Sequence, residues 1–466
     1  MLFSSIPFLY YFLPCVLMLY FISPRKLKNA ALLLASLVFY GWGEPLYLLL
    51  MVGSILIGYI SGRLIETFQG KALSKVALWG AVIVHLAFLG YFKYADFFIT
   101  NFNAVTGLAI PLLRIALPIG ISFYTFQIIS YEIDVYRRDV AAQRNIIDLA
   151  AYVSMVPQLI AGPIVRYADI ALQLRERRHT LDKTALGIRR FVLGLAKKIL
   201  IANTLGELCD IFRAADETSV LFYWMYGIAF SLHIYFDFSG YSDMAIGLGH
   251  IFGFTFLENF NYPYISRSVT EFWRRWHMSL GSWFRDYVYI PLGGNRVSKV
   301  RWFFNIFVVW MLTGFWHGAA WNFVLWGLMF AVLLIIEKLW LGRFLKKYRV
   351  LSHIYVLFMV MISFILFNAP DLATAWTDVV SLFGVGDLPL ISAEAVYYLR
   401  SFAVIIALAV IGATPLPKKL AARFSESRIG TRVMTIAEPL ILVVLMILMT
   451  AYLVDGSFNP FLYFRF

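Results

Sequence analysis

The sequence predicts an all-α, polytopic integral membrane protein, and three observations lead to this fold class. Of the 466 residues, 61% are hydrophobic and only 14% are charged, against about 25% charged residues in a soluble domain. Apolar runs near the length that crosses a bilayer as a helix, roughly 20 residues, follow one another along the chain. No long polar block remains that would fold as a separate soluble domain. We therefore expect one integral membrane domain covering residues 1–466.

The first apolar run, Phe8 to Ile22, has no basic leader and no small-residue cleavage site, and its basic residues follow it. We expect this run to remain as the first span. Cys15 lies in this run and Cys209 lies far away in another. The two cysteines therefore provide neither a disulfide framework nor a zinc-binding spacing.

The net charge of +13 comes from basic residues in short loops between apolar runs, not from one continuous face. This pattern follows the positive-inside rule and does not indicate nucleic-acid binding. Segments 43–45, 204–218 and 369–394 carry few or no basic residues, so we expect them to face outside. If these outer segments alternate along the chain with the basic loops, the chain crosses the membrane about ten to twelve times, with Met1 and Phe466 on the outer side. The basic loops, which we place in the cytoplasm, are 24–28, 63–75, 137–144, 166–190, 296–301, 338–349 and 418–432.

The apolar run that follows Arg301 is short. Only about a dozen residues precede Gly314, too few to cross a bilayer at a rise of about 1.5 Å each. The next run, Phe323 to Ile336, descends again. We therefore expect a turn at residues 314–322 that holds His317 at membrane depth, where non-helical backbone is buried in protein or lines a wet cavity. A histidine in such a cavity is a candidate for catalysis.

The segment 259–296 mixes charged and aromatic residues, which favours interfacial or re-entrant helices. Its arginines, among them Arg274 and Arg275, suit the mouth of a tunnel that binds an anionic, phosphate-bearing donor. The alternative is that these arginines and aromatics simply form an interfacial belt. His277 lies in the same segment and is a second histidine with aromatic and apolar neighbours.

The other histidines have structural interpretations. His233 and Asp237 are four residues apart and share a helix face, which favours a structural polar pair. Neither HxxxH nor HExxH occurs, so we predict no metal site. The histidines interpreted as packed or solvated residues are His85, His179, His250 and His353.

Three segments together resemble the membrane-bound O-acyltransferase family, in the branch of alginate and other polysaccharide O-acetyltransferases: residues 235–247, 272–296 and 314–322. The similarity extends over essentially the whole chain. The resemblance implies a ring of helices around a thin centre pierced by a tunnel, in the bacterial cytoplasmic (inner) membrane. It also implies His317 as the catalytic histidine and His277 as a second characteristic polar position. The implied donor is a cytoplasmic thioester, with acetyl-CoA the most consistent choice, and no permanently bound cofactor is expected.

The expected chemistry suits these residues. Transfer of an acyl group from a thioester to a hydroxyl needs a general base near neutrality, and burial favours the neutral, proton-accepting form of a histidine such as His317. The tetrahedral intermediate needs hydrogen-bond donors for its oxyanion. His277, Trp316 and Asn322 are all candidates, and the sequence does not choose among them. The residues predicted to bind donor or substrate are Arg274, Arg275, Trp276, Trp316 and Asn322.

The last nine residues, 458–466, place Tyr463 three residues from the end. This ending resembles the carboxy-terminal tyrosine motif of the same branch and of the partner peptides of teichoic-acid D-alanylation. We hypothesise that Tyr463 receives the acyl group as an ester and passes it to an extracytoplasmic acceptor. The alternative is an aromatic anchor for the final helix.

The chain contains no serine-hydrolase motif, so we expect a separate periplasmic acetyltransferase partner that completes transfer to a polysaccharide. Membrane lipid is the other expected partner, and nucleic acid is not. Alternative functions are D-alanylation of teichoic acid, peptidoglycan O-acetylation and proton-coupled transport. The segments around His277 and His317 have no second copy in the chain, which favours an enzyme over a transporter.

Overall fold

The computed structural model describes residues 2–159 and 161–456, and within them every regular element is helical. The predicted all-α class is confirmed. Contacts group the chain into two compact units, unit 1 with Met1–Phe191 and Ser242–Leu257, and unit 2 with Val192–Tyr241 and Glu258–Phe466. The single domain predicted for residues 1–466 stays a prediction.

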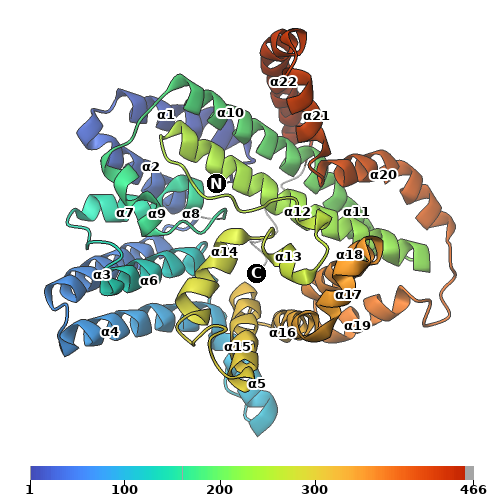
Figure 1. Ribbon diagram of the computed structural model, residues 1–466, viewed down its shortest axis with the longest axis horizontal. Helices are drawn as coiled ribbons and strands as arrows, with labels where there is room; N and C mark the ends of the chain where they lie inside the picture. Colours follow the sequence, from blue (N-terminus) through green and yellow to red (C-terminus); the bar gives the residue numbers. More distant parts are fainter. Residues whose placement is uncertain (1, 160, 457–466) are drawn as a thin grey trace. The chain divides into compact units, whose positions relative to one another are not determined.

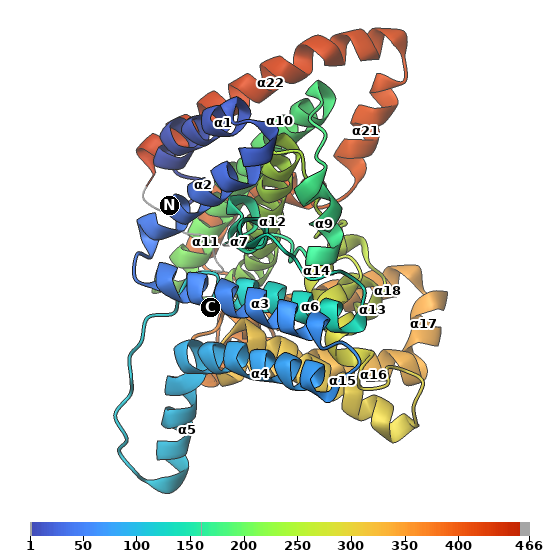
Figure 2. The ribbon, with the colours of Figure 1, turned by 90° about the vertical axis from the view of Figure 1, so that its left-hand side faces the viewer.

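Unit 1 packs around three long helices, α3, α4 and α6, which lie side by side (Figure 1, Figure 2). Gly62 of α3 allows the close approach, because a Cβ there would lie 2.6 Å from the Tyr131 hydroxyl. Its elements are η1 (Pro7–Phe12), α1 (Leu13–Ile22), η2 (Arg25–Leu27), α2 (Lys28–Gly43), α3 (Tyr47–Thr67), α4 (Ala72–Leu89), η3 (Gly90–Tyr94), α5 (Ala95–Thr106), α6 (Ile121–Arg137), α7 (Ile146–Ser154), α8 (Val156–Leu159), α9 (Tyr167–Arg175) and most of α10 (Leu181–Ala196).

Unit 2 contains the segments that the sequence analysis singled out. Its hydrophobic core joins α11, α12, α16 and α18. Its elements are η4 (Lys197–Ala202), α11 (Asn203–Ala214), most of α12 (Val220–Ile251), η5 (Pro263–Ile265), α13 (Val269–Trp273), α14 (Met278–Phe284), η6 (Arg285–Tyr289), α15 (Lys299–His317), α16 (Trp321–Ile336), η7 (Glu337–Leu341), α17 (Gly342–Lys347), α18 (Arg349–Asn368), α19 (Leu372–Ser381), α20 (Ala393–Gly412), α21 (Leu416–Ser425) and α22 (Arg428–Asp455).

Several helical stretches have the length and apolar composition of membrane spans, so the chain is a multi-pass membrane protein. α20 and α22 are little buried, since only 11% and 6% of an 18-residue apolar stretch in each helix is buried, as expected of helices that face lipid. The number of crossings stays a prediction. Within the described residues, six helical stretches are long and apolar enough to cross a membrane: Tyr47–Thr67, Ala72–Thr106, Trp321–Lys347, Arg349–Asn368, Ala393–Gly412 and Arg428–Asp455.

The predicted turn at residues 314–322 was wrong in its extent. α15 continues as one helix of 19 residues to His317, about 28 Å long, and only residues 318–320 are non-helical before α16 begins. Gly314 lies inside the helix, where a Cβ would lie 2.2 Å from the carbonyl oxygen of Phe323 in α16. This glycine therefore allows two neighbouring helices to touch (Figure 1) and does not mark a turn.

The segment 259–296 forms short helices separated by loops, and its interfacial or re-entrant position in the membrane stays a prediction. α13 has 5 residues and α14 has 7, so neither is long enough to cross a bilayer. These elements carry the candidate site.

Candidate active site

The short helix α13 is anchored to the end of α16. The carboxylate of Glu337 accepts hydrogen bonds from the backbone N–H groups of Val269, at 2.5 Å, and Thr270, at 3.0 Å. Ser268 caps the same turn by accepting from the N–H of Glu271 at 3.0 Å. A buried carboxylate is stable at a helix N-terminus because the unpaired N–H groups point toward it. These bonds fix the start of the segment that leads to His277.

His277 occupies a strained position at the start of α14. Its φ of 43° lies in the left-handed region, which residues other than glycine adopt uncommonly and which clusters at functional sites. The side chain is 1% exposed, and the ring of Phe238 meets it edge to face, with centroids 4.7 Å apart. The backbone and the core together hold the imidazole in one orientation.

The side-chain oxygen of Asn259 orients the His277 ring. Its Oδ1 lies 3.0 Å from His277 Nδ1 and accepts from the Ser279 hydroxyl at 2.8 Å. An amide oxygen only accepts hydrogen bonds, so Nδ1 carries the proton and Nε2 is the acceptor nitrogen of the neutral ring. This assignment of the tautomer follows from the bonding network. Burial lowers the pKa of His277 to about 3, so the ring is neutral at physiological pH.

His317 is the last residue of α15 and lies among aromatic rings. Its side chain is 5% exposed. The ring of Trp326 in α16 meets it edge to face with centroids 5.0 Å apart, and that of Phe367 in α18 does the same at 5.4 Å. Three helices therefore enclose this imidazole in apolar surroundings.

Trp316 joins the two histidines. Its ring centroid lies 4.9 Å from that of His317 and 6.1 Å from that of His277. The indole is itself buried. Both predicted histidines thus contact the same tryptophan, although they are 40 positions apart in the sequence.

A cavity of about 690 Å³ reaches His277, within the range of about 300–1,000 Å³ typical of ligand pockets. Arg274 places a guanidinium at its wall, and Arg285 also lines the wall but is paired with Asp286 at 2.6 Å. Thr313, also in the wall, lies one helical turn before His317 on α15. A phosphate-bearing ligand would find a guanidinium donor here, next to His277. The lining residues are Thr270, Trp273, Arg274, His277, Met278, Leu280, Gly281, Ser282, Phe284, Arg285, Tyr289, Ile306, Val309, Trp310, Thr313 and Leu334.

Three residues predicted to bind donor or substrate have structural partners. Arg275 pairs with Glu271 at 2.9 Å; burial tends to raise the pKa of Glu271, but the Arg267 N–H and Arg275 hold it below its ordinary value. Trp276 stacks on Phe272 in the core. The amide of Asn322 donates to the carbonyl of Ala369 at 3.0 Å. Contacts with a donor stay a prediction for these three residues.

His233 and Asp237 each have another close partner. The Nδ1 of His233 lies 2.6 Å from the Ala202 carbonyl oxygen, and Asp237 forms a buried ion pair with Lys198 at 2.6 Å. Both contacts tie α12 to η4. Tyr463 lies outside the described residues, and within those residues no group of three or more metal-binding side chains occurs.

Sequence reasoning did not identify Asn259, Glu337 or Thr313. Asn259 lies in a loop whose sequence resembles any polar connection, and Glu337 falls in a basic stretch where it reads as a solvated charge. Their roles depend on contacts across 18 and 68 positions of sequence separation. No local pattern indicates such contacts.

Comparison with known proteins decides the class of site. A sequence model of the membrane-bound O-acyltransferase family matches residues 138–374, which include both histidines. The chain belongs to the membrane-bound O-acyltransferase family. As a member it is an O-acyltransferase.

Curated relatives of this acyltransferase cover most of its length. It is 44% identical to the probable alginate O-acetylase AlgI of Azotobacter vinelandii, over 83% of this chain and 79% of the relative. It is 42% identical to the protein of the same name in Pseudomonas putida, over the whole of both chains. It is also 34% identical to the peptidoglycan O-acetyltransferase of Helicobacter pylori, over 86% of this chain and 83% of the relative. The acyltransferases it resembles thus include enzymes named for two different acceptors.

Proposed function

We propose that this acyltransferase moves an acetyl group from acetyl-CoA, on the cytoplasmic side, to a polysaccharide outside the bacterial inner membrane. One observation carries the proposal: two buried histidines contact one tryptophan beside an arginine-bearing cavity. The guanidinium of Arg274 suits the phosphates of the donor. The names of the alginate relatives support acetyl as the acyl group and a glycan as the acceptor.

His317 acts as the general base in this proposal. Its Nε2 or Nδ1 takes the proton of the attacking hydroxyl, the oxygen bonds to the thioester carbonyl carbon, and a tetrahedral intermediate forms. The C–S bond then breaks and the imidazolium returns its proton to the departing thiolate. The products are an ester and free coenzyme A, so atoms and charges balance. Apolar rings around His317 exclude water, which would hydrolyse the thioester.

Tyr463 is the proposed first acceptor. Its phenolic oxygen receives the acetyl group as an aryl ester, and a hydroxyl of a periplasmic acetyltransferase partner or of the glycan then displaces it. Phenolate leaves more readily than an aliphatic alkoxide because its parent acid has a pKa of about 10. This step requires the carboxy-terminus on the outer side, as the distribution of basic loops predicts.

The test is covalent labelling of the full-length protein in detergent with radiolabelled acetyl-CoA. We expect label on the wild type, released by mild base, and none on His317→Gln or Tyr463→Phe. A matched control is Tyr452→Phe, because Tyr452 is a 56% exposed tyrosine of α22, eleven positions before Tyr463 in the sequence. Label that persists in Tyr463→Phe would contradict the relay, and label that persists in His317→Gln would contradict the base.

A further inference from the structure

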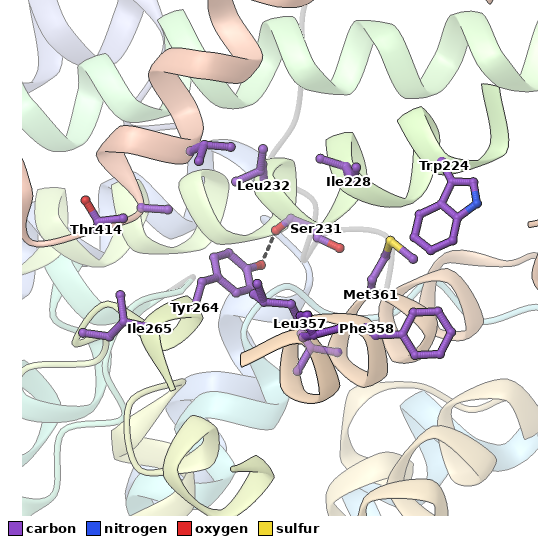
Figure 3. Close-up of a pocket in the computed structure, with 14 residues that line it drawn as sticks. Trp224, Ile228, Ser231, Leu232, Tyr264, Ile265, Leu357, Phe358, Met361 and Thr414 are labelled. Atoms are coloured by element: carbon purple, nitrogen blue, oxygen red, sulfur yellow. Dashed lines mark hydrogen bonds between the residues drawn. The ribbon is translucent and has the colours of Figure 1, made fainter. Parts of the chain in front are cut away.

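A second cavity in unit 2 lies apart from the histidines. It has a volume of about 490 Å³ and is formed by α12, η5, α18 and α20. Figure 3 shows it as an elongated space with Thr414 and Ile265 at one end and Trp224 at the other. The lining residues are Trp224, Ile228, Ser231, Leu232, Tyr264, Ile265, Ile354, Leu357, Phe358, Val360, Met361, Val410, Ala413 and Thr414.

This second cavity, called the groove from here on, has a mostly apolar wall, although four of its lining residues carry polar groups. Tyr264 donates its hydroxyl hydrogen to the Ser231 carbonyl (Figure 3). The indole N–H of Trp224 donates to the Leu382 carbonyl at 2.9 Å. The Ser231 hydroxyl donates to the Gly227 carbonyl in α12, and the Thr414 hydroxyl donates to the Ile411 carbonyl at the end of α20, both at 2.7 Å. Because these donors are already satisfied by main-chain oxygens, the groove offers a ligand chiefly dispersion contacts and burial of apolar surface.

The groove opens on a surface that faces lipid. Ile228, Leu357 and Val410 line it and are 40%, 44% and 50% exposed. α18 and α20, which form two of its walls, are both candidate membrane spans. Lipid hydrocarbon surrounds such helices, so an acyl chain can enter the groove from the side.

Basic residues come shortly after Thr414, which lies at one end of the groove. α21 begins two residues later and carries Lys418, Lys419 and Arg423, all exposed. In the described part of the chain no acidic side chain lies within ion-pair distance of these three residues. Exposed Leu416, Leu420 and Phe424 recur every fourth residue along the same helix, a pattern typical of helices that lie in the membrane interface.

We infer that this groove and α21 form one binding site for an anionic phospholipid. One acyl chain occupies the groove between α12, α18 and α20, and the phosphate lies against Lys418 and Lys419. Charge complementarity selects the headgroup, since each basic residue near an anionic lipid surface contributes roughly a five-fold preference. The site is separate from the catalytic histidines, so it holds a structural lipid and takes no part in acyl transfer.

The test uses phosphatidylglycerol with a photoactivatable diazirine in one acyl chain, incorporated in detergent with the full-length protein. Crosslinked peptides are mapped by mass spectrometry. We expect crosslinks on residues 224–232, 354–361 and 410–414. Unlabelled phosphatidylglycerol should displace the probe at roughly a twenty-five-fold lower concentration than phosphatidylcholine, as two lysines at roughly five-fold each predict.

Different variants test acyl-chain binding in the groove and headgroup binding by the lysines. Ile228→Trp and Leu357→Trp fill opposite walls and should each reduce the crosslinks, whereas Val443→Trp, on exposed α22, should not. Lys418→Gln with Lys419→Gln should remove the headgroup preference, whereas Lys71→Gln with Lys75→Gln, in another basic loop, should retain it. Crosslinks spread equally over α22, crosslinks that persist in both filled variants, or equal competition by phosphatidylcholine against the wild type would each overturn the proposal.

Discussion

Asn259 and His277, 18 positions apart, form the hydrogen bond that fixes which nitrogen of the buried histidine carries its proton. The Asn259 oxygen also accepts from the hydroxyl of Ser279, so one side chain organises both polar groups at the start of α14. The bond leaves Nε2 as the acceptor nitrogen of His277. Asn259 is therefore a positioning residue, and it acts through the histidine.

Replacing Asn259 tests this relationship. We expect Asn259→Leu to lower kcat for acetyl transfer by roughly ten- to a hundred-fold, the effect of losing about 1–3 kcal/mol of buried hydrogen bonding, with little change in KM. Asn259→Asp keeps an acceptor oxygen and should recover part of the rate. Asn261→Leu, two residues along and exposed, is the matched control. Equal rates for the Leu and Asp variants would contradict a positioning role.

The contact between α15 and α16 depends on two glycines. A Cβ on Gly314 would lie 2.2 Å from the Phe323 carbonyl oxygen, and one on Gly327 would lie 2.2 Å from that of Trp310. We expect either change to alanine to cost about 1–3 kcal/mol by overpacking, seen as a lower melting temperature in detergent. In α4, Gly80→Ala meets no heavy atom within 4 Å and should stabilise the helix by about 0.5–1 kcal/mol. A Gly314→Ala protein as stable as Gly80→Ala would show that the helices can separate freely.

The sequence predicts the fold class, but it does not predict the role of a glycine such as Gly314. Composition and apolar runs predict the all-α membrane class because the hydrophobic requirement of a bilayer acts on every span. The sequence predicts a turn at Gly314 because the apolar run between Arg301 and Gly314 is too short to cross a bilayer. A glycine is needed at this position because the carbonyl of Phe323 on the neighbouring helix α16 leaves no room for a Cβ. Only the packed structure shows this contact.

The sequence likewise identifies some residues of the candidate site and misses others. His277 and His317 could be identified because imidazoles are rare in apolar segments. Asn259 and Glu337 could not, because an asparagine in a loop and a glutamate in a basic stretch have ordinary local explanations. Arg274 and Arg275 are adjacent in sequence, yet one lines the cavity and the other pairs with Glu271. The difference is set by the direction of each side chain at the end of α13.

Protonation of His277 should make stability depend on pH. Burial lowers its folded pKa to about 3, whereas in the unfolded chain the value is about 6.5. Between these values the unfolded chain binds the extra proton, so stability is complete above pH 6.5 and falls as pH decreases. The expected slope from this residue is about 1.4 kcal/mol per pH unit.

Thermal melting of the wild type and His277→Asn between pH 7 and pH 5 measures that slope. Asparagine tolerates the left-handed backbone and does not titrate, so the variant should lose less stability on acidification. If both proteins lose stability in parallel, His277 is not the group that takes up the proton.

Arg274 should contribute to donor affinity by charge. Its side chain is exposed and lines the cavity beside His277, so the interaction with donor phosphates is screened by solvent and worth about 1 kcal/mol at most. We expect Arg274→Gln to raise KM for acetyl-CoA by about two- to five-fold, to leave kcat unchanged and to weaken the dependence of KM on salt. Arg275→Gln is the neighbouring control: it breaks the pair with Glu271 and should lower the melting temperature while KM retains the wild-type salt dependence. A larger change in salt dependence for Arg275→Gln than for Arg274→Gln would mean that the donor approaches from the other side of α13.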